Sequence, residues 1–315
     1  MPALLNKNKV KRAALGIHRL GIRLGVQILP SHYYSPVPNI IDLEKTVDEW
    51  AKRSELPGVS VDLEDQARNL RRICGPYETE YAGNEVYREA VSNGSGPGYG
   101  YIEAQCLHGV LRHFKPSKVV EVGSGVSTYC MLEALNRNQK ETGSPCQLVS
   151  IEPHPSQRLQ ALSQINLLKR NVQSVAFEVF TSLGKGDFLF IDSSHTVKPG
   201  GDVNFLILEV LPRLRAGVIV HFHDIYLPYD YPRDTLRTFL HGMETSLLHA
   251  FLMFNSRAKI IFCLSQLHYD RSEVLREVFP EYVRQADRQG LQLDDRKPFD
   301  SIEEHFPSSI YLEIH

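Results

Sequence analysis

From residue 99 onward, short runs rich in β-branched residues alternate with longer windows of helical periodicity. This alternation is typical of a mostly parallel sheet whose strands are joined by crossover helices that cover both faces. We therefore expect an α/β fold with seven strands. The expected strands are 118–122, 147–151, 172–180, 188–191, 218–222, 259–264 and 310–314, of which the last two lie at or near an antiparallel edge. The expected helices are 101–114, 128–138, 156–169, 203–214 and 235–251.

The densest turn signal in the chain is the run Asn93-Gly-Ser-Gly-Pro-Gly98, since glycine and proline punctuate regular structure most strongly. It predicts a boundary between a helical N-terminal extension, residues 1–98, and a main domain, residues 99–315. The extension is expected to dimerise, to bind lipid or to act as a lid over the site, and these alternatives stay open. The charged residues 270–300 are predicted to form a helical insertion in the main domain.

The N-terminus is basic and amphipathic. Residues 1–41 contain six lysines and arginines and no acidic residue. At about 100° per residue, the apolar side chains of 10–28 share one helical face and the arginines lie roughly opposite. This pattern predicts a helix that packs on its own domain or on a second subunit of a homo-oligomer, or that lies on a membrane surface through residues 9–28. An organelle transit peptide is the third alternative.

The composition of the chain bears on its partners, its compartment and its relation to membranes. A net charge of −2 gives no global field that would attract nucleic acid, so no nucleic-acid partner is expected. The five cysteines are odd in number and widely spaced, which favours a reducing, cytoplasmic compartment over a disulfide framework. No apolar run approaches the roughly 20 residues that span a bilayer, so no transmembrane segment is expected.

A glycine-rich loop follows the first expected strand, in the run Val119-Val-Glu-Val-Gly-Ser-Gly-Val-Ser-Thr128. In such folds ligands bind beyond the carboxyl ends of the strands, and glycines let the backbone approach them closely. The next strand ends at Glu152, an acid suited to bind ribose hydroxyls. A dinucleotide fingerprint would require glycine at the position of Thr128, so NAD is the less favoured ligand.

The run Glu121-Val-Gly-Ser-Gly125, followed by Glu152 and then Asp192 at the ends of later strands, resembles the signature of class I methyltransferases over roughly residues 99–264. The resemblance implies a Rossmann-like fold that binds S-adenosylmethionine. It implies that Glu121 and Gly123–Gly125 hold the methionine end and that Glu152 takes both ribose hydroxyls. Thr181 and Ser182, which follow the expected third strand, would lie near the adenine. The other cofactor-site candidates are Gly123, Ser124, Gly125, Ser127, Thr128, Asp192 and, as a residue that closes over the cofactor, Tyr101.

Two acids and three histidines follow the expected fourth and fifth strands, in Ile191-Asp-Ser-Ser-His-Thr196 and Val220-His-Phe-His-Asp-Ile225. A hydroxyl becomes a good nucleophile only once its proton is removed, so its methylation requires positioning and a base. The spacing Asp192-x-x-His195 places a base one turn beyond a carboxylate that can bind a metal, and a bound cation lowers the pKa of an oxygen acceptor. His221 is expected to face away from His223 and to be a buried core histidine.

These residues resemble the metal-dependent sugar O-methyltransferases of macrolide biosynthesis and a relative from cephamycin biosynthesis. In those enzymes a D-x-x-H motif and an acidic pair after the fifth strand supply the metal ligands and the base. The resemblance implies Asp192 and Asp224 as metal ligands and His195 as the general base. The chain departs from the pattern at His223, where those relatives have a carboxylate. His223 is therefore a candidate ligand or a second catalytic group, and imidazole favours manganese, iron or zinc over magnesium.

Three tyrosines occur in the run Ile225-Tyr-Leu-Pro-Tyr-Asp-Tyr-Pro232, and they are expected either to stack on a sugar ring or to pack as a connector. With His32-Tyr-Tyr34, the whole resembles an uncharacterised bacterial methyltransferase family associated with glycan modification. We therefore expect an O-methyltransferase that acts on a hydroxyl of a sugar, a glycan or another small molecule. The alternatives are a non-catalytic protein of the same fold and a methyltransferase for protein or nucleic acid.

Overall fold

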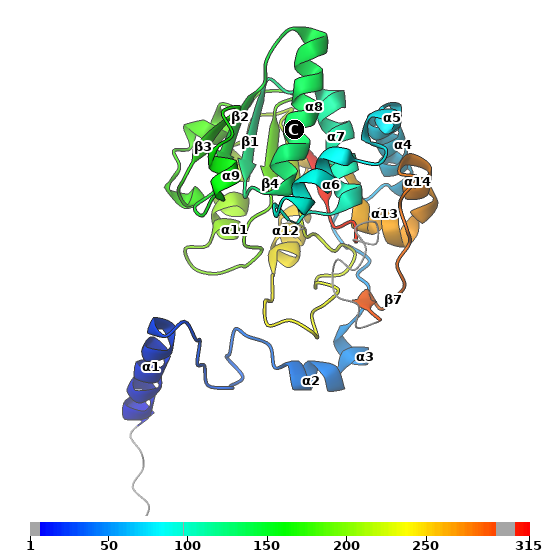
Figure 1. Cartoon of the computed structure of the whole chain (residues 1–315). Coiled ribbons are helices and arrows are strands. Elements are labelled where there is room, and N and C mark those ends of the chain that lie inside the picture. The colour runs from blue at the N-terminus through cyan, green and yellow to red at the C-terminus, as the bar shows by residue number, and fades with distance from the viewer. Residues whose placement is uncertain (1–6, 97, 294–305) are drawn as a thin grey trace, which may run out of the picture. The chain divides into compact units, whose positions relative to one another are not determined.

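The computed structural model describes residues 7–96, 98–293 and 306–315, with side chains from residue 11 onward. It divides into two compact units (Figure 1). The N-terminal unit comprises the residues up to Trp50 together with Leu236–His241. The sheet unit comprises Ala51–Thr235 and Gly242–His315.

A seven-stranded sheet forms the centre of the sheet unit, in the order β3-β2-β1-β4-β5-β9-β6. All neighbouring strands pair in parallel except β9, which is antiparallel to both β5 and β6. The predicted α/β fold with a mostly parallel sheet and an antiparallel edge is therefore confirmed. The strands are β1 (Lys118–Val122), β2 (Gln147–Ile151), β3 (Ile165–Leu168), β4 (Phe188–Ile191), β5 (Ile219–Phe222), β6 (Ala258–Cys263) and β9 (Ile310–Ile314).

Both faces of the sheet are covered, because successive side chains of a strand point to opposite faces. Phe188 and Phe190 of β4 belong to one buried cluster, which includes residues of the helices α4, α7, α8 and α14. Leu189 and Ile191 belong to a second cluster, which includes residues of the π-helical segment η3 and of α12. Strands buried on both faces need near-continuous apolar sequences, and all four residues of β4 are buried.

Two of the longer helices of the sheet unit, α7 and α8, lie at the places in the chain that the alternating pattern predicted. The helix α7 ends just before β1, and α8 begins directly after the glycine-rich loop; the two lie side by side in Figure 1. The helices of this unit are α4 (Leu63–Cys74), α5 (Glu78–Tyr81), α6 (Glu85–Ser92), α7 (Tyr101–Phe114), α8 (Val126–Thr142), α9 (Gln157–Gln160), α10 (Glu178–Thr181), α11 (Asp202–Asn204), α12 (Glu244–Leu252), α13 (Leu264–Asp270) and α14 (Ser272–Val278), with the shorter or irregular turns η1 (Gly75–Tyr77), η2 (Val172–Ser174), η3 (Phe205–Val210) and η4 (Leu211–Arg213).

Residues 51–98 belong to the sheet unit and pack on it. Helix α4 packs against β6 and α7, and α6 packs against α8. Five side chains of α4 are buried, including Leu70 and Ile73. The predicted boundary at residue 98 thus lies inside a compact unit that begins at Ala51.

The third strand is not where the sequence pattern placed it. A helix over 156–169 and a strand over 172–180 were expected, but α9 ends at Gln160 and β3 is Ile165–Leu168. The capping hydroxyl of Ser156, which accepts from the backbone N–H of Leu159, starts a helix that lasts only one turn. Because β3 is an edge strand and none of its residues is fully buried, its sequence carries a weak apolar signal.

Two expected helices are shorter than predicted. The window 235–251 contributes only α12, because residues Leu236–His241 fall in the N-terminal unit. In the window 270–300, α14 is followed by a two-stranded hairpin of β7 (Asp287–Arg288) and β8 (Leu291–Gln292) rather than by further helix. Residues 294–300 of that window lie outside the described residues. The sheet unit is therefore less helical after β5 than expected.

The N-terminal unit contains the expected first helix, α1 (Lys7–Arg23), followed by α2 (Ile40–Lys45) and α3 (Val47–Trp50). A hydrogen bond from the indole N–H of Trp50 to the carbonyl of Leu43 ties α3 to α2. Within the described residues, no helix combines the length and the apolar character needed to cross a bilayer.

Candidate cofactor cavity and acid–histidine site

A cavity of about 330 Å³ lies at the carboxyl end of β1, where the glycine-rich loop leaves the sheet. Gly123 has a φ of 81° in this loop, and a Cβ there would come within 1.7 Å of the carbonyl oxygen of Asp192. Only glycine fits such an approach between two strand ends. The predicted residues that line the cavity are Gly123, Ser124, Gly125, Ser127, Glu152 and Asp192.

The turn predicted as a domain boundary also lines this cavity. Ser95, Gly96 and Gly98 contribute to its wall, and so does the buried Tyr99. Sequence reasoning missed Ser95, Gly96 and Gly98 because a glycine-rich turn gives the same pattern whether it links domains or approaches a ligand. Ser124 also lines the cavity, and its hydroxyl is buried without a hydrogen-bond partner among the described residues. The cavity thus offers close backbone and an unsatisfied polar group to a ligand.

Glu121 lies behind the loop rather than in the cavity wall. Its fully buried carboxylate accepts hydrogen bonds from the hydroxyls of Ser127 at 3.2 Å, Thr128 at 2.7 Å and Ser150 at 2.7 Å. Burial disfavours the charged carboxylate and raises the pKa of Glu121 to about 8, although the three hydroxyls oppose this. Glu121 and Thr128 therefore hold the loop in shape from beneath.

Three predicted cofactor residues lie elsewhere. The hydroxyl of Tyr101 donates to the carboxylate of Glu281, and its ring stacks against Arg88. Ser182 bonds Lys118, the first residue of β1, and therefore lies at the amino end of the sheet together with its neighbour Thr181. The misplaced third strand explains this error, since the residues that follow β3 are those after Leu168.

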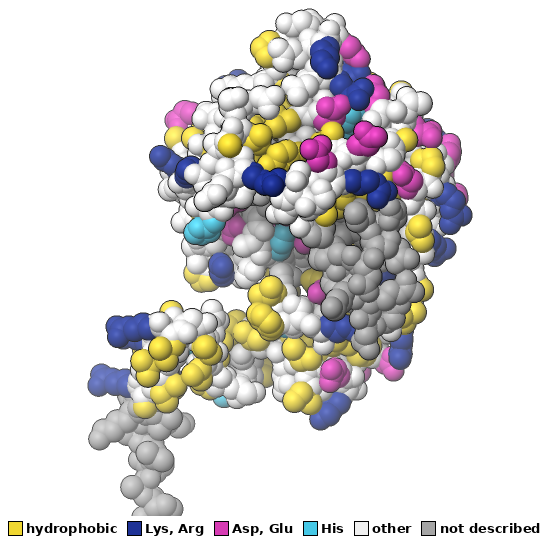
Figure 2. Space-filling view, in the orientation of Figure 1, with side chains coloured by type: hydrophobic (Ala, Val, Ile, Leu, Met, Phe, Trp, Pro, Cys, Tyr) yellow, Lys and Arg dark blue, Asp and Glu magenta, His cyan; other side chains and the backbone are white. Residues whose placement is uncertain are grey.

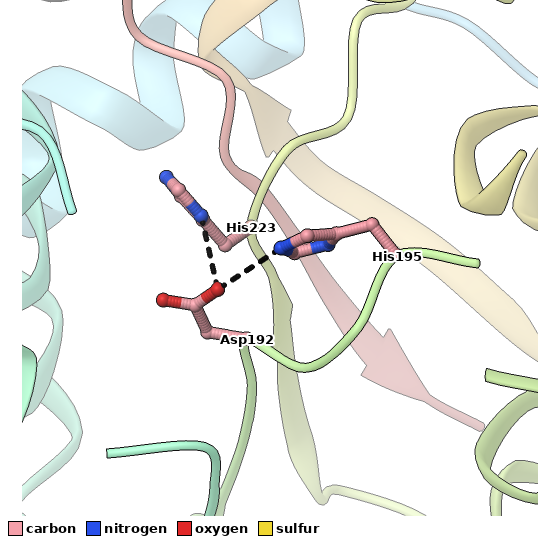
Figure 3. A group of neighbouring side chains, drawn as sticks. All are labelled: Asp192, His195 and His223. Carbon is pink, nitrogen blue, oxygen red and sulfur yellow. Dashed lines mark hydrogen bonds and ion pairs between the residues drawn. The ribbon is translucent and has the colours of Figure 1, made fainter. Parts of the chain in front are cut away.

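Asp192, His195 and His223 converge at the carboxyl ends of β4 and β5 (Figure 3). Oδ1 of Asp192 lies 3.3 Å from Nε2 of His195 and 3.2 Å from Nδ1 of His223. One donor atom from each residue lies within 4.8 Å of the other two. Because Asp192 also lines the cavity, this group borders directly on the glycine loop.

Asp224 completes the group from the other side. Its Oδ2 lies 3.5 Å from Nε2 of His195 and 3.8 Å from Nδ1 of His223, and its Oδ1 accepts from the hydroxyls of Tyr226 and Ser308. Both His195 and Asp224 have a φ of 55°, in the left-handed region that side-chain-bearing residues rarely adopt. Such strain is retained where the surrounding structure fixes it, and it is frequent at functional sites.

Two buried carboxylates that sequence reasoning missed stand behind the histidines. Oε2 of Glu244, the first residue of α12, lies 2.8 Å from Nδ1 of His195. Oε2 of Glu103, in the first turn of α7, lies 3.1 Å from Nε2 of His223. Neither residue follows a strand or belongs to a motif, so only the folded chain brings them to the site.

The charges at this site stabilise one another. Burial disfavours every ionised form, but the carboxylates of Asp224 and Asp192 outweigh it and hold the pKa values of His195 and His223 well above the usual range. Reciprocally, against the same effect of burial, the imidazoles lower the pKa values of Asp192 and Asp224. Without another cation present, the acids are thus ionised and the imidazoles carry the compensating protons.

The donor atoms fit a metal ion. Neighbouring ligand atoms that are held at about 2.0–2.2 Å from one ion lie about 3–3.6 Å apart. Three of the four contacts around this group fall between 3.2 and 3.5 Å, and the fourth is 3.8 Å. A histidine that binds a metal almost always has its second nitrogen held by a carboxylate or carbonyl, and Glu103 holds His223 in this way. The residues present therefore suit a divalent ion that accepts both nitrogen and oxygen ligands.

His221 is buried as expected, but it faces the same side of the sheet as His223. Residues two apart on a strand share a face, so the expected opposite orientation is wrong. Its Nε2 lies 2.9 Å from the hydroxyl oxygen of Ser309 and 3.2 Å from that of Tyr99. Its ring stacks on Phe190 at 4.4 Å. His221 is therefore a core histidine that lies two residues before His223 on the same strand.

Of the three tyrosines after Asp224, two pack as the expected connector and the third contacts the site. Tyr229 and Tyr231 are buried and pack against each other, as a connector would. Tyr226 is only partly buried, and its hydroxyl reaches the carboxylate of Asp224 at 2.8 Å. Only Tyr226 belongs to the site.

The segment that carries this arrangement is similar to known proteins. Residues 120–225, which include the glycine loop and the strand ends that carry the acid–histidine group, match the family model described as "Methyltransferase domain". An uncharacterised protein from Archaeoglobus fulgidus is 27% identical over 167 residues, which are 49% of this chain and 72% of that protein. A Podospora anserina methyltransferase, solved with bound S-adenosylhomocysteine, aligns with 72% of this chain and 92% of its own at 15% identity, but the TM-score is only 0.36.

The order of the sheet and the place of the glycine loop are those expected of class I methyltransferases, and the family model covers the same segment. The cavity lies beyond the carboxyl ends of the strands, where such folds bind their ligands. Residues 120–225 are therefore similar to known methyltransferase domains, and the sheet order and the place of the cavity agree with that similarity.

Proposed function

We propose that the protein methylates a hydroxyl of a sugar, a glycan or another small molecule, with S-adenosylmethionine as methyl donor. One observation carries this proposal: the convergence of Asp192, His195, His223 and Asp224 directly beside the cavity of the glycine loop. A base and a set of metal-type ligands next to a methyl donor match what O-methylation requires. The sugar or glycan acceptor rests on the resemblance of the Asp192-x-x-His195 motif to sugar O-methyltransferases.

The cofactor would occupy the cavity. Glu152, at the end of β2, is the candidate for the ribose hydroxyls, and its Oε1 accepts from the backbone N–H of His154 at 2.7 Å. Gly123 and Gly125 leave room for close approach of the ligand, and the free hydroxyl of Ser124 can bond to its polar end. Ser95, Gly96 and Tyr99 would close the cavity from the side of the turn before α7.

The transfer needs one proton acceptor. The acceptor's oxygen forms a bond to the methyl carbon while the bond from that carbon to the cofactor's sulfonium breaks, which releases S-adenosylhomocysteine. The hydroxyl proton passes to Nε2 of His195, whose Nδ1 is held by Glu244 at 2.8 Å. In this role His195 must be neutral before the reaction, with its proton on Nδ1. Because Asp192 and Asp224 hold its pKa high in the ion-free chain, this role requires a bound cation that balances their charge.

Asp192, His223 and Asp224 would hold a divalent metal. Such an ion would supply positive charge beside the acceptor oxygen and thereby lower the pKa of the hydroxyl. The imidazole of His223 replaces a carboxylate of the resembling enzymes, and it favours manganese, iron or zinc over magnesium. Ser308 and Tyr226, which donate to Oδ1 of Asp224, leave Oδ2 directed toward the two histidines.

Calorimetric titration with S-adenosylhomocysteine tests the proposal first. The purified chain is measured after metal removal by EDTA and again with manganese or magnesium restored. Micromolar binding in every condition supports the cofactor site. Transfer of a labelled methyl group to methyl glycosides or polyols, seen only with metal restored, supports the hydroxyl acceptor and the metal. Failure to bind S-adenosylhomocysteine would favour a non-catalytic protein, whereas binding with transfer to protein or nucleic acid alone would replace the acceptor class.

We propose in addition that the N-terminal unit contacts an anionic membrane surface. Among the described residues, most large apolar side chains that are exposed belong to this unit, including Leu20 at 58% and Leu24 at 73%. They gather on the face of α1 in Figure 2, with basic side chains beside them. Arg12, Arg19 and Arg23 accompany them, and no acid occurs in residues 1–41. An apolar face flanked by cations alone suits anionic lipid, whereas a second copy of the same helix would repel it.

Flotation with vesicles tests this contact on the full-length chain. Binding to vesicles of phosphatidylcholine and phosphatidylglycerol, but not to phosphatidylcholine alone, is expected. Replacement of Arg12, Arg19 and Arg23 by glutamate should abolish it. The matched control replaces three exposed cations of the sheet unit, Arg158, Lys169 and Lys185. Equal vesicle binding by both variants would contradict the proposal. If the wild type is instead a dimer and only the arginine variant is monomeric, the apolar face of the N-terminal unit contacts a second subunit.

A further inference from the structure

We propose that Glu103 and Glu244 are positioning residues that fix which ring nitrogen of each site histidine faces the site. Each carboxylate is buried, lies outside every sequence motif and faces the far nitrogen of one imidazole. Glu103 thereby directs Nδ1 of His223, and Glu244 directs Nε2 of His195, toward Asp192. This inference rests on the proposed function for the identity of the acceptor and the metal, but its tests do not require methyl transfer.

Glu244 holds His195 at two points. Its carboxylate lies 2.8 Å from Nδ1, and its backbone N–H donates to the carbonyl of His195 at 3.2 Å. The chain just before it also approaches closely, because a Cβ at Gly242 would lie 2.8 Å from that same carbonyl oxygen. These contacts fix a residue whose backbone is left-handed. Nε2 is thereby directed to Asp192 and Asp224 at 3.3 and 3.5 Å.

Glu103 joins three segments around His223. Its Oε2 accepts from the backbone N–H of Gly100 at 3.2 Å and lies 3.1 Å from Nε2 of His223. Its Oε1 accepts from the backbone N–H of Ser308 at 3.0 Å and from the hydroxyl of Ser309. Both oxygens are thus occupied, and the carboxylate cannot rotate without the loss of several bonds. His223 therefore presents Nδ1 to Asp192.

The consequence is a fixed tautomer for each ring. In a neutral imidazole one nitrogen carries the proton and the other accepts, and the partner of the first decides which is which. In the ion-free chain both nitrogens of each ring face carboxylates, Asp192 being shared by the two rings. A divalent ion at Asp192 and Asp224 would balance their charge, and the proton that each ring keeps would then be the one that faces Glu244 or Glu103: on Nδ1 in His195 and on Nε2 in His223.

The sheet unit contains a comparable pair away from the site. Nε2 of His108 lies 2.9 Å from Oε2 of Glu80, and both are at least mostly buried. There, however, Arg112 also donates to Glu80, and the pair does not face other carboxylates of the site. Glu80 is therefore a matched control for the loss of a carboxylate behind a buried histidine.

Metal titration separates the two roles. Glu103→Ala and Glu244→Ala are compared with Glu80→Ala in the full-length chain, with folding checked by thermal denaturation and by the affinity for S-adenosylhomocysteine. We expect Glu103→Ala to weaken Mn²⁺ binding about 10–100-fold, as loss of a partner behind a metal ligand does, and Glu103→Gln to restore part of it. Glu244→Ala and Glu80→Ala should leave Mn²⁺ affinity within about twofold, because on this proposal neither lies behind a metal ligand.

The ¹⁵N spectra of histidine-labelled protein with bound Zn²⁺ provide the second readout. His195 should be protonated at Nδ1 and His223 at Nε2, and Glu244→Ala should change the first alone. A wild-type tautomer opposite to either assignment would overturn the inference. Equal loss of Mn²⁺ affinity in Glu244→Ala and Glu103→Ala would also overturn it, because His195 would then be a ligand. Absence of Mn²⁺ binding by the wild type would overturn the role of Glu103. Binding of S-adenosylhomocysteine by the same protein would show that the cofactor site is nevertheless formed.

Discussion

Two carboxylates at the ends of neighbouring strands behave in opposite ways. Glu121 belongs to β1 and Asp192 follows β4, and these strands pair in parallel from Val119↔Phe188 to Val122↔Ile191. Burial penalises the ionised form of both. Yet the pKa of Glu121 is raised to about 8, whereas the pKa of Asp192 is lowered below its usual range.

The neighbours explain the difference. Glu121 meets only hydroxyl donors, which carry no net charge and do not overcome the cost of burial. Asp192 lies beside the imidazoles of His223 and His195, and their positive charge overcomes the cost of burial. In the half of the site around the glycine loop, the buried Glu121 is thus protonated and supports a cavity that a ligand can enter. The other half, at β4 and β5, concentrates charge where a proton must move.

The largest expected effect comes from the removal of the proton acceptor in the charged half. His195→Gln should lower methyl transfer about 10²- to 10⁴-fold, the usual contribution of a general base. S-adenosylhomocysteine affinity should stay within about twofold, since His195 does not line the cavity. Single-turnover transfer and calorimetry measure the two quantities. Undiminished transfer would remove His195 from the mechanism, and loss of Mn²⁺ binding in this variant would make it a ligand instead.

The sequence predicts the fold well where strands are buried. All of β1, β2, β4, β5, β6 and β9 lie at or within a residue of the expected places, because buried strands carry continuous apolar runs. Even the edge strand β6 has five of its six residues buried. The other edge strand, β3, lacks that signal, so its expected position was wrong. Thr181 and Ser182, which were expected to follow it, lie at the amino end of the sheet.

The sequence predicts only those site residues that directly follow the ends of strands. Asp192, His195, His223 and Asp224 are close in space because parallel strands end at one edge. Glu103 and Glu244 come from helices that are distant in sequence, and no local pattern marks them. Tyr99 rather than Tyr101 faces the cavity, a distinction that depends on how α7 begins and not on residue type.

Gly123 joins the two halves of the site, and its replacement tests how closely they depend on each other. Gly123→Ala would place a Cβ 1.7 Å from the carbonyl oxygen of Asp192, at a φ of 81°. We expect a loss of about 2–4 kcal/mol in the free energy of unfolding, since both a clash and a disfavoured backbone must be accommodated. Urea denaturation measures it, with Gly143→Ala as a control at a similar φ of 73° and with open space around the glycine. Equal losses in both variants would mean that the approach to Asp192 contributes nothing.

In the half of the site around the glycine loop, replacement of Glu152 should weaken cofactor binding rather than turnover. Glu152→Gln should weaken S-adenosylhomocysteine binding about 10- to 100-fold, the range for a lost hydrogen bond to a charged group. Turnover at saturating cofactor should change much less, because Glu152 lies apart from the acid–histidine group. Calorimetry and initial rates separate the two effects. Unchanged affinity would exclude Glu152 from the ribose site.

The smallest effect expected concerns the proton on Glu121. The folded chain retains this proton up to about pH 8, whereas an ordinary glutamate with a pKa of 4.5 loses it earlier. Between these values the folded state binds more protons than the unfolded state, so this residue makes stability fall as pH rises. Glu121→Gln cannot titrate, and its free energy of unfolding should therefore rise relative to that of the wild type by at most about 1.4 kcal/mol per pH unit. Urea denaturation at about pH 6 and about pH 7 measures this difference. A difference that is the same at both pH values would mean that Glu121 is ionised in the folded protein, and the contrast with Asp192 would then disappear.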